Sequence, residues 1–156
     1  MSLEKQLIRA IKNRNVGKVR SLLKKGANIS AKTNDGMSAI FVAVTKNKDI
    51  VQLLLDYGAD VNDQFTDFAR SNDSTIVRTY MPITFMLMGK LNENDKRDKI
   101  DILKLLLQAG ANPCTTCVYE DADGIILVSI LSNANPEILF LLLTFGAELR
   151  TCLERD

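Results

Sequence analysis

No histidine occurs anywhere in the 156 residues. Most serine and cysteine hydrolases need an imidazole as general base, so this absence excludes their mechanisms. The chain also lacks a glycine-rich phosphate-binding loop and a G-x-S-x-G nucleophile motif, which mark many nucleotide-binding and hydrolase sites. The residues therefore predict no catalytic site, and we expect a protein that is not an enzyme.

Long apolar runs are missing too. The most apolar segments, residues 125–131 and 138–145, are far shorter than the roughly 20 residues that cross a bilayer. Leu3, Leu7 and Ile8 alternate with charged residues, so the first residues do not have the pattern of a secretion signal. We expect no membrane contact and an intracellular protein, with the cytoplasm as the first assignment and the nucleus as the second.

Cysteine is scarce, and its number is odd. Cys114, Cys117 and Cys152 do not suit a disulfide framework, which favours a reducing compartment. Two thiolates at the spacing of Cys114 and Cys117 can share a metal or form a redox pair. A closed zinc site needs two more ligands, and no histidine is available. We expect no metal and no cofactor, and a metal-binding or redox protein is the alternative function.

The net charge of +1 conceals an uneven distribution. Residues 1–32 hold nine Lys and Arg against Glu4 alone, whereas residues 33–156 hold eleven against eighteen acids. Solvated helix faces account for such a pattern, and a nucleic-acid or anionic-surface binder is the alternative. The basic residues have no aromatic neighbours that would stack on bases, so nucleic acid is not the expected partner.

One phrase recurs four times: two leucines, two further residues, then Gly-Ala and a polar residue. Its glycines, Gly26, Gly58, Gly110 and Gly146, follow one another at intervals of 32, 52 and 36 residues. Each phrase is typical of a helix end, where a left-handed glycine lets the last carbonyls find donors. Upstream, residues 7–30 align without gaps on residues 39–62, with the apolar positions coinciding. Each unit is therefore predicted to be two short helices.

The second unit gives the clearest local signals. Ser38 is expected to cap a helix that runs to about Thr45, and Asp49 to cap another that runs to about Tyr57. Residues 34–36, Asn-Asp-Gly, predict a tight turn before the first helix. Two helices and a turn cannot bury their own apolar faces, so the units must stack as a solenoid.

This combination of turn, two short helices and Gly-Ala-Asp/Asn resembles the ankyrin repeat, whose period is about 33 residues. Residues 36–43 and 58–62 carry the resemblance best, and the third unit keeps Met81-Pro82-Ile83. The resemblance implies an all-α, ankyrin-type helical repeat solenoid with short β-turn fingers. It is expected to form a single domain over residues 1–156, with units at 4–30, 33–62, 63–113 and 118–150.

Two departures from the family pattern stand out. The family has a Thr-Pro-Leu-His motif, whose histidine is replaced here by Phe41, Thr84 and Ser129, so its hydrogen bonds cannot form. The second interval, 52 residues between Gly58 and Gly110, also exceeds the family period of about 33 by about 19. We assign about ten of these to the finger at Asp63–Tyr80 and about nine to the helix connection at Gly89–Lys99.

The resemblance implies that a protein partner is recognised by finger tips and by the exposed side of each first helix. On that analogy the contact residues of the second unit are Asn34, Asp35, Met37, Thr45 and Lys46. Those of the fourth unit are Ala122, Asp123, Ile125 and Asn133.

Two further surfaces follow from residue types. The long finger carries aromatic and arginine residues, which dominate interface energetics: Phe65, Phe68, Arg70, Arg78 and Tyr80. Contact with a partner and packing onto the chain's own repeats are both open for these residues. Residues 138–145 are apolar with Glu137 as the one nearby charge, which predicts self-association through the last unit.

Overall fold

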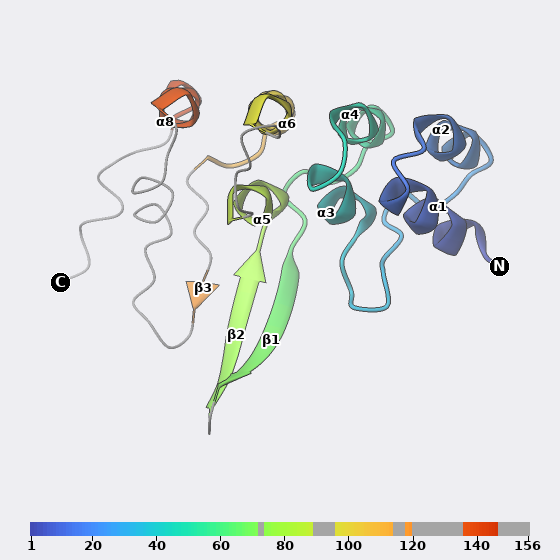
Figure 1. Ribbon diagram of the computed structural model, residues 1–156, viewed down its shortest axis with the longest axis horizontal. Coiled ribbons are helices and arrows are strands. Elements are labelled where there is room, and N and C mark those ends of the chain that lie inside the picture. Colours follow the sequence, from blue (N-terminus) through green and yellow to red (C-terminus); the bar gives the residue numbers. More distant parts are fainter. Residues whose placement is uncertain (72–73, 89–95, 114–117, 120–135, 147–156) are drawn as a thin grey trace.

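The computed structural model describes residues 1–71, 74–88, 96–113, 118–119 and 136–146. Helices pair along the long axis of the molecule, and fingers project to one side of them (Figure 1). The paired helices are α1 (Leu3–Lys12) with α2 (Val16–Lys24), α3 (Ala39–Val44) with α4 (Lys48–Asp56), and α5 (Pro82–Met88) with α6 (Lys96–Gln108). A further helix, α8 (Pro136–Thr144), packs on α6. The described part is thus a stack of helix pairs, as the repeated phrase predicts.

Each helix layer packs on its neighbours in sequence. In one layer α1 contacts α3 and α3 contacts α5; in the other α2 contacts α4, α4 contacts α6 and α6 contacts α8. Positions that the alignment makes equivalent have the same burial. Ile11 and its equivalent Ala43 are fully buried, and so are Val19 and its equivalent Val51. The predicted alignment of the first two units is therefore confirmed by burial.

The helix ends follow the expected left-handed glycine geometry. Gly26, Gly58, Gly110 and Gly146 have φ between +83° and +93°. At the end of α4 the Gly58 amide donates to the Leu55 carbonyl at 2.9 Å. This hydrogen bond satisfies a carbonyl that the helix itself leaves without a donor.

The predicted helix starts need two corrections. Asn47, and not Asp49, caps α4, because its side-chain oxygen accepts from the Ile50 amide at 3.1 Å. Ser38 does stand at the cap of α3, but its side chain makes no capping hydrogen bond. Its hydroxyl is buried and has no hydrogen-bond partner among the described residues.

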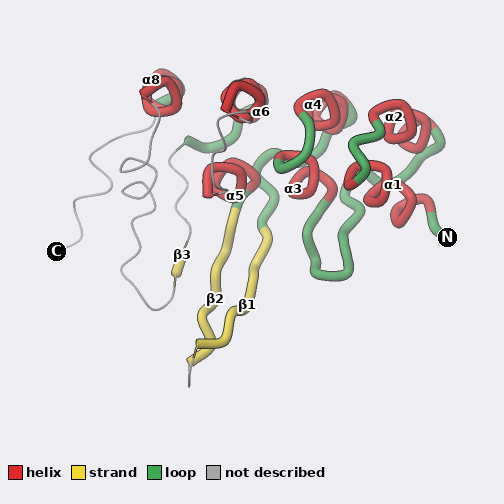
Figure 2. Tube along the Cα trace, in the orientation of Figure 1, coloured by secondary structure: helices red, strands yellow, loops and turns green. Residues whose placement is uncertain are grey.

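The two fingers differ in structure, as Figure 2 shows. The finger of the second unit is a short turn, with one β-bridge between Lys32 and Ser38. The long finger is an antiparallel hairpin of β1 (Phe65–Ser71) and β2 (Ser74–Tyr80), and β3 (Val118–Tyr119) pairs with the other edge of β2. The sheet goes beyond the short β-turn fingers that were expected.

The predicted helix connection at residues 89–99 overlaps the start of α6. Residues 96–99 already belong to α6, and residues 89–95 lie outside the described part. Pro82 occupies the first position of α5, as expected, because proline lacks the amide hydrogen that this position does not use.

The glycine geometry yields a stability prediction. Gly58→Val is expected to lower the free energy of unfolding by more than about 1 kcal/mol, because a β-branched residue fits a left-handed backbone poorly. No atom lies within 4 Å of the position that a Cβ would take, so the cost comes from the backbone alone. Gly17→Val, in α2 at an ordinary φ, is the control and should change stability little. Equal melting temperatures for the two variants would contradict the assignment.

Candidate functional site

An aromatic cluster anchors the long finger to the helix stack. It contains Phe41 of α3, Phe65 of β1, Tyr80 of β2 and Phe85 of α5, whose ring centroids lie 5.6–6.4 Å apart. Four of the five ring pairs are edge-to-face, and such pairs contribute roughly 0.5–1.5 kcal/mol each beyond the burial of their surface. The base of the hairpin is therefore part of the core.

This cluster corrects two of the predicted contact residues. Phe65 and Tyr80 face each other in the strand register, and only 8% and 7% of their surfaces are exposed. Their rings pack on the chain's own repeats and cannot form the surface that a partner meets. The packing alternative is correct for these two aromatics.

Phe68 is placed differently. Side chains alternate along a strand, so Phe68 lies on the opposite face of β1 from Phe65, and 68% of its surface is exposed. On the same face, the hydroxyls of Thr66 and Thr79 lie 3.2 Å apart across the hairpin and link the two strands. The finger thus combines a buried root with an exposed aromatic residue farther along β1.

The positions of the missing histidine are occupied in two ways. Phe41 is fully buried at the centre of the aromatic cluster. Thr84 uses its hydroxyl to accept from the Met81 amide and to donate to the Met81 carbonyl, both at 2.9 Å. Ser129 lies outside the described residues. The threonine therefore stabilises the start of α5 through its hydroxyl.

The predicted contact residues of the second unit lie at the surface. Asn34, Asp35, Thr45 and Lys46 are exposed, and Met37 is half-buried. The turn that presents Asn34 and Asp35 is closed by two backbone hydrogen bonds, from the Thr33 amide to the Met37 carbonyl and from the Gly36 amide to the Thr33 carbonyl. The Thr33 hydroxyl also accepts from the Met37 amide.

The remaining predictions are less fully covered. Arg78 is half-buried on β2, opposite Asp67, and only the backbone of Arg70 is described. The positions proposed in the fourth unit lie outside the described residues: Ala122, Asp123, Ile125 and Asn133.

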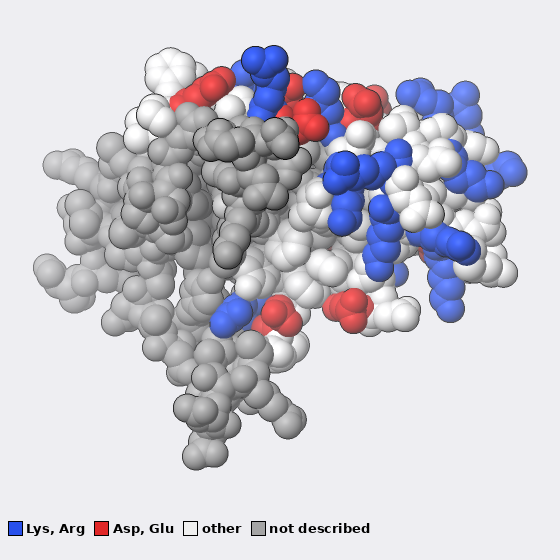
Figure 3. All heavy atoms as spheres, in the orientation of Figure 1, with Lys and Arg blue, Asp and Glu red and all other residues white. Residues whose placement is uncertain are grey.

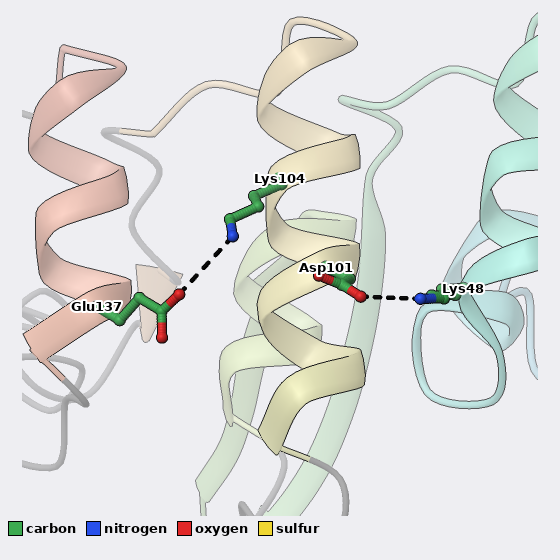
Figure 4. A network of polar contacts seen from close by, with 4 residues as sticks. All are labelled: Lys48, Asp101, Lys104 and Glu137. Carbon is green, nitrogen blue, oxygen red and sulfur yellow. Dashed lines mark hydrogen bonds and ion pairs between the residues drawn. The ribbon is translucent and has the colours of Figure 1, made fainter.

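Ion pairs link neighbouring repeats along one helix layer. The Lys48 ammonium of α4 donates to Asp101 of α6 at 2.9 Å, and Lys104 of α6 lies 3.7 Å from Glu137 of α8 (Figure 4). The hydrogen bond from Lys48 lowers the pKa of the Asp101 carboxyl, and the same hydrogen bond raises the pKa of Lys48. These four side chains therefore connect three successive helices.

A second link between repeats was not predicted. The side chain of Asn62 donates to the Gly110 carbonyl and accepts from the Asn112 amide, both at 3.0 Å. It joins the ends of the second and third units through main-chain groups. The repeated Gly-Ala-Asp/Asn phrase marks where these ends lie, and it could have indicated that they meet.

Neither a membrane span nor a metal cluster is found in the part of the chain that the structure covers. No helix there is long and apolar enough to cross a bilayer. No three Cys, Asp or Glu side chains in that part group as metal ligands. Cys114, Cys117 and Cys152 lie outside it, so the expectation for the cysteine motif stays a prediction.

Comparison with known proteins assigns the repeat. Residues 4–65 match a family model that is described as ankyrin repeats (3 copies). This part of the chain consists of ankyrin repeats, and the predicted fold class, a helical repeat solenoid, is confirmed.

Two curated relatives are similar over a short region. The inactive serine/threonine-protein kinase TEX14 of Bos taurus is 40% identical over 67 residues, which are 42% of this chain and 4% of that protein. Its counterpart from Mus musculus is also 40% identical over 67 residues, with 42% of this chain and 5% of the relative covered. The chain thus spans about one twentieth of the length of these relatives.

The Lys48–Asp101 pair predicts a pH dependence. A carboxyl whose pKa is lowered by folding stabilises the fold above its ordinary pKa of about 3.9, and the contribution is lost as the pH falls through the lowered value. Asp101→Asn should therefore reduce the melting temperature at pH 7, and the difference from wild type should vanish in acid. The decrease should be small, because 44% of the Lys48 side chain and 35% of the Asp101 side chain are exposed.

Lys48→Gln and the double variant complete the thermodynamic cycle. If the two residues act through each other, the double variant should be no less stable than either single variant at pH 7. A difference between Asp101→Asn and wild type that stays constant from neutral pH into acid would contradict this assignment.

Proposed function

We propose that the chain binds a protein partner through its finger side, with Phe68 as the anchoring side chain. Ankyrin repeats are generally protein–protein interaction modules. One observation carries the proposal beyond that general role: a large aromatic ring is 68% exposed on a hairpin whose root is held in the core. A rigidly mounted aromatic residue loses little conformational entropy on binding, which is why such residues are enriched at interface centres.

The predicted contact residues of the second unit add polar groups to this proposal. Asn34, Asp35, Thr45 and Lys46 supply hydrogen-bonding and charged groups. Met37 adds a partly accessible apolar side chain to the turn of the second unit. We include Arg70 and Arg78 of the hairpin, and the fourth-unit residues Ala122, Asp123, Ile125 and Asn133, as further contact positions to be tested.

We infer that this binding involves no catalysis, metal or cofactor supplied by the chain. The lack of histidine supports this inference, as does the typically non-catalytic character of ankyrin repeats. The relatives are named as inactive kinases, which agrees with it over the short region that they share with this chain. We assign the protein to the interior of the cell, because its odd cysteine count suits a reducing compartment.

A pair of alanine variants tests the anchor. Phe68→Ala should abolish capture of the partner that wild-type protein retains from a lysate, and leave the melting temperature nearly unchanged. Phe65→Ala should lower the stability by roughly 3–5 kcal/mol, because it empties a buried aromatic site. Capture is quantified by mass spectrometry and then repeated with the purified partner.

Tyr57→Ala is the matched control, because Tyr57 is a 41% exposed aromatic residue at the end of α4. It should leave both capture and the melting temperature unchanged. Retention of the partner by Phe68→Ala at wild-type affinity would exclude the finger as the anchor.

Self-association through α8 is a second proposal with its own support. Phe140, Leu143 and Phe145 have 68%, 39% and 40% of their surfaces exposed. We propose that two copies bury these side chains against each other. Sedimentation of wild-type protein should show a dimer at high concentration, and Phe140→Glu should shift it to monomer. A wild-type chain that stays monomeric at high concentration would refute this contact.

A further inference from the structure

The outer surface of the first helix pair carries charge of one sign. Eight lysines and arginines lie on α1, on α2, in the turn between these helices and directly after α2. All eight are exposed: Lys5, Arg9, Lys12, Arg14, Lys18, Arg20, Lys24 and Lys25. We call these eight residues the basic face. Figure 3 shows mostly Lys and Arg over α1 and α2, whereas over α4, α6 and α8 Asp and Glu lie beside further Lys and Arg.

Helical geometry makes the basic face continuous. On α1, Lys5, Arg9 and Lys12 recur at intervals of four and three residues, so they form one stripe on the side away from the buried Leu7 and Ile11.

On α2 the same division holds. Val19, Leu22 and Leu23 form the buried side of α2. Lys18, Arg20 and Lys24 lie on its exposed side. The two helices pack on each other, so their outer sides join in one surface.

A single acid stands against this charge in the first repeat. Residues 1–32 contain nine Lys and Arg and a single acid, Glu4. The ion pairs seen in the described residues, Lys48–Asp101 and Lys104–Glu137, join later helices and use none of the eight. Unpaired like charges at close spacing repel one another, so the basic face gains most from a ligand that carries negative charge.

Backbone strain at Arg14 points to the same surface independently. Arg14 has φ of +55° and is the only described residue other than glycine with a positive φ. Its amide donates to the Ile11 carbonyl, and the next amide donates to Ala10. Gly26, Gly58 and Gly110 make the same hydrogen bonds at their own helix ends. Arginine is disfavoured in this conformation relative to glycine, so a charged side chain is held here at a cost in stability.

We propose that the basic face binds an acidic, extended segment of a partner protein, independently of the Phe68 finger. A carboxylate-rich chain matches the positive charge of this face, and it needs neither aromatic residues nor an exposed apolar side to bind there. Neither α1 nor α2 contains an aromatic residue that could stack on bases. Their apolar sides are buried in the core and cannot insert into a bilayer.

Fluorescence anisotropy with a labelled twelve-residue peptide of alternating Glu and Asp tests the proposal. Wild-type protein should bind the peptide at low salt, and the affinity should fall at least about tenfold as salt screens the charges. The triple variant Lys5→Gln, Arg9→Gln, Lys12→Gln should bind at least about tenfold more weakly. Glutamine keeps a similar helix propensity, so α1 should stay folded.

Arg14→Gly separates binding from structure. Removing the strained side chain should raise the melting temperature or leave it unchanged, while affinity for the peptide falls. Arg97→Gln removes the same charge from an exposed position on α6 and should leave peptide affinity at the wild-type value.

Three outcomes would overturn the proposal. The triple variant could bind the peptide as tightly as wild type does. A twenty-nucleotide oligothymidine could bind more tightly than the peptide at equal salt, which would identify a nucleic-acid site. Vesicles rich in phosphatidylserine could compete the peptide away, which would identify a membrane surface.

Discussion

Each helix pair in this chain has an apolar face that only a neighbouring pair can cover, and the whole structure depends on that contact. The requirement is most concentrated between the second and third units. There Phe41 is enclosed by Phe65 and Phe85, with Tyr80 completing the cluster. Two helices of one layer, α3 and α5, and the base of the long hairpin meet at this point. Because a repeat stack is stabilised by contacts between neighbours, loss of this cluster would weaken the junction between the first two units and the rest.

The same cluster explains how a long finger can hold an aromatic residue at the surface. A two-stranded hairpin is only marginally stable alone in water. Here its root is buried on α3 and α5, and β3 adds backbone pairing at Arg78 and Thr79. An aromatic residue beyond that root, Phe68, is held at the surface without support from a partner. The finger is therefore ordered by the core and leaves its outer face available.

Much of the fold could be predicted because it follows from local chemistry. The glycines that end helices need a positive φ wherever they occur, and the apolar periodicity identified the buried sides of α2 and α4. The roles of Phe65 and Phe68 could not be separated, because strand alternation gives no sign of which face meets the helices. The ion pairs were detectable in principle: Asp49, Asp101 and Glu137 each precede their helix-ending glycine by nine residues. The local sequence cannot identify which lysine each acid pairs with, because Lys48 and Asp101 are 53 residues apart.

That recurring acid also explains why the first repeat differs electrically from those that follow. In α6 and α8 it accepts an ion pair from the preceding helix, so positive charge on one repeat is matched by negative charge on the next. The equivalent position in α2, nine residues before Gly26, is Gly17. With no acid there, the neighbouring Lys18 and Arg20 have no counter-charge on their own helix. Ion pairs use four charged side chains of α4, α6 and α8, whereas the lysines and arginines of α1 and α2 are left exposed. A negatively charged partner would therefore meet its strongest attraction at the first repeat, at the opposite end of the stack from the apolar surface of α8.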